Sequence, residues 1–299
     1  MNDKTIISAI STTYFIIVSF FTFIFLFLTA LFIILQNGFY IENISIPNVK
    51  IKQLYIKWNE KIDVSVESVS IIKSKSKNKT ALTYENIGEY LKIASRYDAL
   101  FGTIAVEKIN FNDISATLKY KEGEEGFFNA NSPLFELQSR LLGKSNVFNI
   151  HIEKLQYLKR NVSLSGDAFL NFQDSELYAN LKINVNDDFD ANVFTKLNAN
   201  ALVYKLQNNK DVKDLRYLIE TLNLPKEVVY WALDAIEMER VSIENASGFI
   251  DFKHPSQALQ NVTINATVHD LNYTYNPKLD AIHSKYAELE FKRGVLFIR

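Results

Sequence analysis

The sequence predicts a mainly β protein with one N-terminal transmembrane helix. Two observations lead to this fold class. No charged residue lies between Lys4 and Glu42, and most of the chain beyond that point alternates apolar and polar residues with a period of two. Such alternation is typical of strands with one apolar and one polar face. Because helical periodicity appears in only two places, we expect a β-sheet with short helical insertions.

The N-terminal element is a candidate membrane anchor. Its apolar core, Tyr14–Leu35, holds 22 residues. As a helix it would rise about 33 Å, which matches the hydrocarbon core of a bilayer. A cleaved signal peptide is the alternative, but its apolar region would be shorter and would end in small residues, whereas this one runs into LQNGFY. The anchor residues that we single out are Tyr14, Phe20, Phe25, Leu31 and Leu35.

The anchor defines two predicted units. Residues 1–37 form a cytoplasmic start and the transmembrane segment. Residues 38–299 form an exported β-rich domain, since no second apolar span follows. The predicted topology is therefore a single membrane crossing with the N-terminus in the cytoplasm.

The exported unit opens with a clear strand pattern. Between Ser45 and Ile71, apolar positions alternate with charged and polar ones. The apolar positions are Val49, Ile51, Leu54, Ile56, Trp58, Ile62, Val64, Val66, Val69 and Ile71. Further strand-like runs are Ile104–Phe111, Ser115–Tyr120, Phe135–Leu141, Val147–Tyr157, Val162–Phe172, Tyr178–Val185, Ala191–Tyr204, Val241–Phe252, Val262–Tyr275 and Tyr286–Ile298. The stretch Lys121–Phe128 is predicted as a solvated turn between two of these runs.

Two segments have helical spacing instead. Residues 83–100 place Ile87, Leu91 and Ala94 on one face, after Thr83 as a cap. Residues 211–237 are interpreted as a helical hairpin, with Pro225 where the second helix would begin.

A degenerate repeat lies within the strands. IAVEKINF and IHIEKLQY share one order of apolar, Glu-Lys and aromatic positions, and IEMERVSI is a looser copy. Each copy contains one step of three between apolar residues, which would move the next apolar side chain to the wrong face of a straight strand. We therefore predict a bend or bulge at that step. The apolar positions are Ile104, Val106, Ile109 and Phe111, then Ile150, Ile152, Leu155 and Tyr157, and Val241 and Ile243 in the looser copy.

Composition and motifs exclude several functions. The 33 basic and 34 acidic residues nearly cancel, so there is no electrostatic footprint for nucleic acid. The chain has no Cys, which removes thiolate metal sites and Cys nucleophiles. Its four His form no metal-binding spacing, and no phosphate-binding or nucleophile-elbow motif occurs. We expect no catalytic residue, metal or cofactor.

Two stretches resemble a known family. LPKEVVYWALDAIEMERVSIENASGFIDF places Leu224 and Pro225 before a helix with Trp231, and a strand with a small-residue turn follows. The end of the chain carries Tyr273, Tyr275 and Pro277 in a Y-x-Y-x-P pattern. With the anchor and the long run of strands, these features resemble the AsmA-like envelope proteins of Gram-negative bacteria, in the YhdP/DUF3971 branch.

The resemblance implies a function. The implied fold is a curled, groove-forming antiparallel β-sheet: in such proteins the strands make an open trough with an apolar lining, which carries phospholipid between the inner and the outer membrane. The implied location is a bacterial inner membrane, with residues 38–299 in the periplasm. On this interpretation the apolar positions named above, from Val49 to Ile71 and in the three repeat copies, are the candidate lining. The implied partners are the membrane, phospholipid acyl chains and an envelope protein that extends the sheet. Family members are longer, so we expect the sheet to continue past Arg299, in this protein or in another chain.

Two alternatives remain. The apolar face could pack against a second sheet or a protein partner, which would make the chain an anchored envelope scaffold or assembly protein with no lipid groove. An anchored enzyme acting on envelope glycans or lipids is the third reading, although no catalytic motif supports it.

Overall fold

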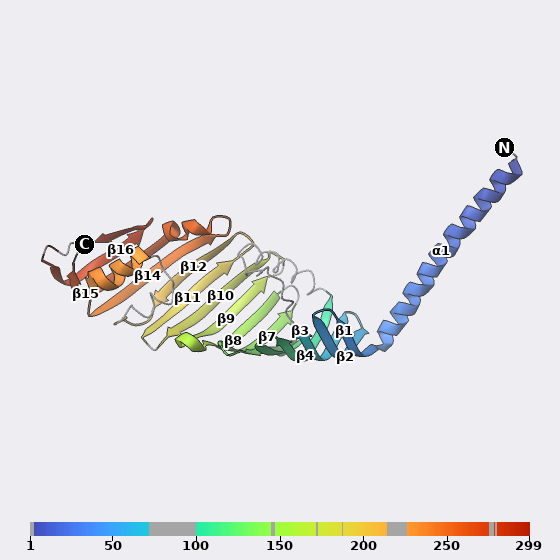
Figure 1. Ribbon diagram of the computed structural model, residues 1–299, viewed down its shortest axis with the longest axis horizontal. Helices are drawn as coiled ribbons and strands as arrows, with labels where there is room; N and C mark the ends of the chain where they lie inside the picture. Colours follow the sequence, from blue (N-terminus) through green and yellow to red (C-terminus); the bar gives the residue numbers. More distant parts are fainter. Residues whose placement is uncertain are drawn as a thin grey trace.

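The chain forms an elongated molecule rather than a closed globule. The computed structural model describes residues 3–71, 100–144, 147–171, 173–186, 188–213, 226–274, 278 and 280–299. One long helix projects from the end of a single sheet (Figure 1). The accessible surface is 20261 Å², whereas a globular protein of 34.4 kDa would expose about 13,000 Å². With so much surface, the apolar residues cannot all lie in one closed core.

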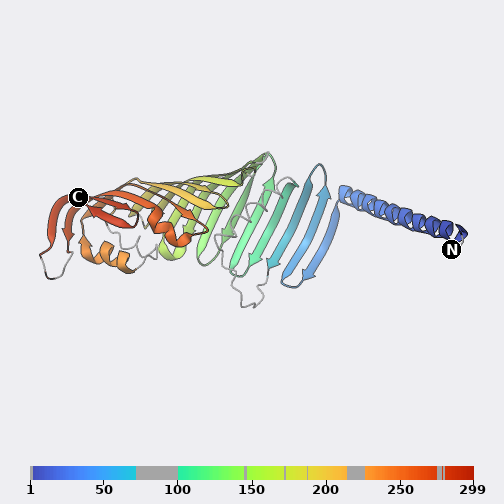
Figure 2. The ribbon, with the colours of Figure 1, turned by 90° about the horizontal axis from the view of Figure 1, so that it is seen from above.

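Helix α1, Asp3–Asn37, projects away from the sheet (Figures 1 and 2) and contacts strand β2 through Phe32 and Trp58. Within the described residues it is the one helix long and apolar enough to cross a membrane, over Val18–Asn37. Of the predicted anchor residues, Phe20, Phe25 and Leu31 are exposed and Leu35 is half-buried, while the side chain of Tyr14 lies outside the described part. A helix that is apolar all round needs an apolar surrounding. The helix is thus compatible with a single-pass membrane anchor.

The rest of the described chain is dominated by one sheet of seventeen strands. The strands are β1 Phe39–Ile46, β2 Val49–Trp58, β3 Ile62–Ile71, β4 Phe101–Phe111, β5 Ile114–Lys121, β6 Glu124–Asn131, β7 Phe135–Lys144, β8 Val147–Tyr157, β9 Val162–Asn171, β10 Glu176–Val185, β11 Phe189–Leu197, β12 Ala201–Asn208, β13 Ile236–Glu237, β14 Arg240–Asp251, β15 Val262–Tyr273, β16 Ile282–Lys292 and β17 Val295–Ile298. The short helical elements are η1 Leu158–Arg160, α4 Lys226–Tyr230, η2 Trp231–Ala235 and η3 Pro255–Asn261.

The strands follow one another in space in nearly their order along the chain. Each pairs with its successor, except that β13 and β14 both pair with β15 and β12 pairs with β14. With adjacent strands about 4.8 Å apart, the sheet extends roughly 70 Å away from α1. It is twisted and only mildly curled, most visibly toward the C-terminal end (Figure 2). The predicted fold class, mainly β with one N-terminal helix and one long antiparallel sheet, is confirmed.

One pair of strands departs from the antiparallel pattern. Strands β3 and β4 are parallel, with Val64 opposite Ile104 and Val69 opposite Ile109. A parallel pair needs a crossover connection instead of a tight turn. Here the connection is residues 72–99, so the predicted helical segment 83–100, apart from Leu100, lies outside the described residues.

Two predicted strands are each divided by a turn. Ala191–Tyr204 is split into β11 and β12 because the side chain of Asn198 accepts hydrogen bonds from the backbone N–H groups of Asn200 and Ala201. Tyr286–Ile298 is split into β16 and β17 at Arg293 and Gly294, whose φ values are 54° and 76°. Two positive φ values in succession are typical of a tight hairpin turn.

Strands β1 and β6 were not predicted, and β13 replaces the end of the predicted helical hairpin 211–237 at Ile236 and Glu237. The prediction of a solvated turn over Lys121–Phe128 is wrong beyond Glu122 and Gly123, because β6 begins at Glu124. Strand β1 directly follows α1 and pairs with β2. Because β1 begins directly after the apolar residues of α1, its short alternation cannot be recognised as a separate strand in the sequence.

The predicted bulges are present in both Glu-Lys copies of the repeat. In β4, Val106 lies opposite Leu118 and Ile109 lies opposite Ala116. Three residue steps in β4 are therefore paired with two residue steps in β5. In β8, Ile152 and Leu155 face Gly166 and Leu164 in the same way. One extra residue per strand keeps both apolar neighbours on one face.

The described hydrophobic core lies in the C-terminal third of the sheet. It joins residues of β10, β11 and β13–β16 to Val212, and Ala191 and Val268 are fully buried in it. The predicted helical hairpin 211–237 falls partly here. Residues 214–225, with its first helix, lie outside the described residues, whereas α4 and η2 form its second helix.

Substitution at Val268 tests this core. Val268 is 0% exposed, and Val268→Ala should lower the free energy of unfolding by about 2–3 kcal/mol because the neighbours cannot fill the cavity. Val203→Ala is the matched control, since Val203 is 48% exposed and should cost less than about 0.5 kcal/mol. Urea unfolding of both variants measures the difference, and equal midpoints would contradict the assignment of the core.

Candidate functional site: the apolar face of the sheet

One face of the sheet is apolar along its whole length. Residues directly opposite each other on neighbouring strands point to the same side, so the strand register identifies the face. One row of partners runs from β1 to β17 through Ile41, Leu54, Val66, Val106, Leu118, Phe128, Ser139, Ile152, Gly166, Leu181, Val193, Leu206, Ala246, Ile264, Phe291 and Leu296. We call this side the apolar face and the opposite side the polar face.

Ser139 is the one hydroxyl in that row. Its side chain is 4% exposed, and its hydroxyl donates a 2.6 Å hydrogen bond to the backbone carbonyl of Phe128. Because the polar group is satisfied within the sheet, it does not interrupt the apolar character of the face.

The sequence-predicted lining residues of β2, β3, β4 and β8 lie on this face. In β2 to β4, Val49 is opposite Ile71 and Ile71 opposite Phe111, and the inner positions follow in register. The remaining aligned partners are Ile51, Val69 and Ile109, then Leu54, Val66 and Val106, then Ile56, Val64 and Ile104, and Trp58 with Ile62. In β8, Ile150, Ile152, Leu155 and Tyr157 are opposite Leu141, Ser139, Leu137 and Phe135.

Sequence reasoning missed where the face begins. Phe39 of β1 is opposite Ile56, and Ile44 is opposite Ile51, so β1 adds apolar residues next to α1. The ring of Phe32 in α1 packs edge-on against Trp58, with 6.2 Å between centroids. The apolar face therefore starts in direct contact with helix α1.

The face is open over much of its length. Val66, Ala116, Ala130 and Ala168 are buried, but most larger side chains on it are half-buried, and Trp58 is 39% exposed. All described strands belong to one sheet, so within the described part of the chain no second sheet covers it. An apolar surface of this extent marks a site of contact with another apolar partner.

The two candidates on β14 lie in a different environment. Val241 is 3% exposed, pairs with Val212 and belongs to the C-terminal core, and Ile243 packs against that core. The structure thus corrects the expectation for Val241. It offers no open lining surface, because this chain's own residues cover the apolar face there.

Polar clusters of catalytic type are not seen in the described residues. His151 pairs with Asp167 at 2.7 Å and His254 with Asp251 at 3.1 Å, both at exposed positions. Among the residues that the structure describes, no three His, Asp or Glu side chains gather as metal ligands do.

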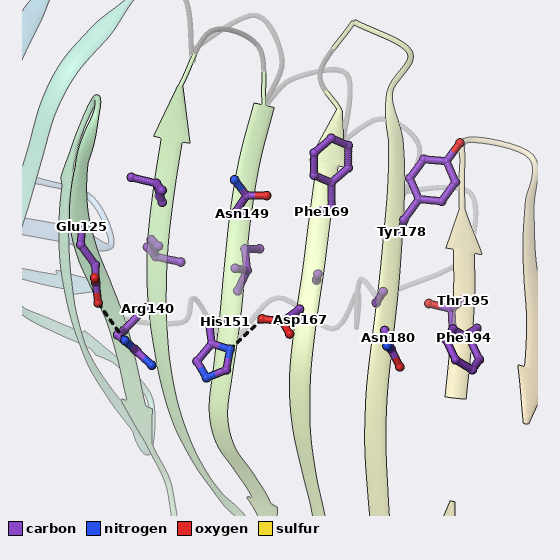
Figure 3. A pocket seen from close by; sticks show the side chains of 15 residues that line it. Glu125, Arg140, Asn149, His151, Asp167, Phe169, Tyr178, Asn180, Phe194 and Thr195 are labelled. Carbon is purple, nitrogen blue, oxygen red and sulfur yellow. Dashed lines mark hydrogen bonds and ion pairs between the residues drawn. The ribbon is translucent and has the colours of Figure 1, made fainter. Parts of the chain in front are cut away.

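The polar face carries a feature that sequence reasoning missed. An open pocket of about 740 Å³ lies over strands β6–β11, and the exposed rings of Phe169, Tyr178 and Phe194 line it (Figure 3). The signal in the sequence is Ala-Phe-Leu at 168–170, where alternation gives way to consecutive apolar residues. Both faces of β9 are therefore partly apolar.

Comparison with protein-family models, curated proteins and solved structures finds no significant match to this chain.

Proposed function

We propose that this protein is a membrane-anchored lipid conduit, whose apolar face shields phospholipid acyl chains as they leave the bilayer. The single observation that carries the proposal is the strand register, which joins apolar residues from β1 to β17 into one continuous face beginning at α1. No catalytic residue or cofactor is required, because the face only has to replace the apolar surrounding that acyl chains lose.

The energetics favour acyl chains as the occupant. An acyl chain gains about 0.8 kcal/mol for each CH₂ group that it buries. Outside the C-terminal third, the half-buried side chains of the apolar face offer this burial on successive strands, so an acyl chain can advance there without crossing a polar barrier. Contacts are spread over many residues, and a single conservative substitution should therefore change little.

The proposed setting follows from the anchor. The N-terminus would lie in the cytoplasm, α1 would cross a bacterial inner membrane, and the sheet would extend roughly 70 Å into the periplasm toward the outer membrane. An envelope protein that continues the sheet would complete the path. The AsmA-like resemblance of the sequence supports this arrangement.

A scaffold is the second candidate, and one observation favours it. In the C-terminal third the apolar face packs against the chain's own residues, including Val212 and Ile236. If the whole face were covered in this way, the protein would be an anchored envelope scaffold or assembly protein with no lipid groove.

Photocrosslinking in the full chain distinguishes the two. A photoreactive p-benzoylphenylalanine placed at Leu181 would lie on the apolar face of β10, roughly 40 Å along the sheet from β1. The matched control is the same residue at Lys182, which is next in sequence, exposed and on the polar face. We expect phospholipid adducts, detected by mass spectrometry after irradiation of membranes, at position 181 and not at 182.

Each other outcome has a clear meaning. A protein adduct at Leu181, without lipid, would replace the conduit with the scaffold. Equal lipid labelling at both positions would show that the sheet merely touches the membrane, and would also contradict the proposal.

A further inference from the structure

The pocket on the polar face is a second candidate site, independent of the lipid proposal. Ten of its fifteen lining residues occupy alternate positions in β6 to β11 that point away from the apolar face. The other five lie next to them in sequence, on a row of the apolar face, and are Leu141, Ile150, Ala168, Ala179 and Thr195. One row contains Asn149, Phe169 and Tyr178, and the next contains Arg140, His151, Asp167, Asn180 and Phe194. Figure 3 shows the two rows side by side on adjacent strands.

Aromatic rings form the apolar part of this pocket. Phe169 and Tyr178 are 38% and 39% exposed, and Phe194 is 44% exposed. The centroids of Phe169 and Tyr178 are 6.4 Å apart, so their rings are in contact. Exposed rings at the floor of a concave surface provide stacking area at a small cost in side-chain entropy.

The ring of Tyr178 is held in place by its neighbours. Its hydroxyl donates a hydrogen bond to Glu176, which also pairs with Lys196 at 2.8 Å, and the Lys196 ammonium lies 5.2 Å from the ring centroid. Hydrogen bonds from Lys196 and then Tyr178 lower the pKa of Glu176 below its usual range, so this carboxylate stays charged at neutral pH. The ring is therefore pre-positioned for a ligand.

The pocket has no unpaired cation among its lining side chains. Arg140 pairs with Glu125 at 3.3 Å and with Glu153 at 2.7 Å, and His151 pairs with Asp167 at 2.7 Å. The carboxylates outnumber the Arg140 guanidinium, so the lining disfavours an anionic partner. The amides of Asn149 and Asn180, by contrast, make no side-chain hydrogen bond with any described residue, which leaves neutral donors and acceptors beside the rings.

The pocket also continues along the sheet. A neighbouring open cavity of about 600 Å³ shares Tyr178, Phe194 and Thr195 with it and reaches β14, where Phe249 is exposed. The two together make an elongated depression that crosses the strands, which suits a linear ligand better than a compact one.

We propose that this depression binds a neutral oligosaccharide chain. The C–H faces of sugar rings stack on aromatic rings, and sugar hydroxyls and acetamido groups exchange hydrogen bonds with amide side chains. A ligand without negative charge suits this lining, and its hydroxyls can also donate hydrogen bonds to the carboxylates of the pocket. In the setting proposed above, such a site would let the protein hold an envelope glycan with its polar face while the apolar face is occupied, but the site itself does not depend on lipid transport.

The test is calorimetric titration of the full chain in phospholipid nanodiscs, since sugar-headgroup detergents would compete. The probes are chitohexaose, cellohexaose and maltohexaose. We expect one of them to bind, and the double substitution Tyr178→Ala with Phe194→Ala to weaken it about tenfold or more, which corresponds to about 1.4 kcal/mol. Tyr286→Ala is the control, because Tyr286 is 68% exposed on β16 and lies outside both cavities.

A further variant tests whether the depression binds a sugar or a protein segment. Asn180→Leu removes an amide but keeps the side-chain size, so it should weaken an oligosaccharide and leave an apolar peptide contact intact or stronger. Failure of all three oligosaccharides to bind at millimolar concentration would overturn the proposal. Binding that survives the double substitution, or that Asn180→Leu strengthens, would overturn it as well.

Discussion

Three aspartates on the apolar face, at Ile152, Leu164 and Leu181, should stop phospholipid from passing β10. The three residues lie on adjacent strands, where Ile152 and Leu181 both pair with Gly166. A carboxylate among acyl chains costs about 2.5–3.5 kcal/mol, and all routes along this face cross β8 to β10. We expect lipid crosslinking at Leu206, beyond the charges, to fall at least tenfold, with crosslinking at Leu118, before them, retained.

A charge-matched variant controls for folding and for net charge. Gln156→Asp, Ser165→Asp and Asn180→Asp add three carboxylates to the same strands, but on the polar face. This variant should leave crosslinking at Leu206 unchanged. If both triple variants lose the distal adduct alike, the apolar face is not the path. If neither loses it, lipid reaches Leu206 by another way, and the conduit proposal fails.

Gly166→Val should cause a large loss of stability. Gly166 has φ +137°, and a Cβ there would lie 2.2 Å from the backbone carbonyl oxygen of Asn180. A backbone atom cannot move aside as a flexible side chain can, so strand β9 would have to separate from β10. We expect the free energy of unfolding to fall by about 3 kcal/mol or more, and the melting temperature by roughly 6–12 °C.

Gly123→Ala isolates the effect of backbone conformation from that of the clash. Gly123 has φ +75°, but no atom lies within 4 Å of its added Cβ, so the substitution should cost only about 1 kcal/mol. Circular dichroism melts of the two variants give the comparison. Equal losses would mean that positive φ, and not the approach of β9 to β10, makes Gly166 necessary.

Each strand presents one set of side chains to the apolar face and another set to the polar face. Strand β9 presents Leu164, Ala168 and Leu170 to the apolar face and Asp167 and Phe169 to the polar face. Substitutions on one face should therefore leave binding to the other unchanged, provided that the register holds. The triple variants above and the pocket variants form a set in which each face is the control for the other.

The sequence by itself determined which residues share a face within each strand. Side chains alternate with a period of two whatever the strand pairs with, so the apolar positions from Val49 to Ile71 could be read directly. The bulge step could also be read, because an odd spacing such as Val106 to Ile109 conflicts with alternation unless an extra residue is inserted. The long apolar helix at the N-terminus, which is compatible with a membrane anchor, was also predictable from local composition.

Only the tertiary structure decided how the strands combine. The parallel pairing of β3 with β4, the start of the apolar face at Phe39 and the burial of Val241 under the chain's own residues depend on contacts between distant segments. The same holds for the polar-face pocket, where Phe169, Tyr178 and Phe194 come from three strands and meet only through the register. Alternation is a property of a single strand. The register between strands and the burial of a sheet face by other segments depend on long-range contacts, which a period-two pattern does not determine.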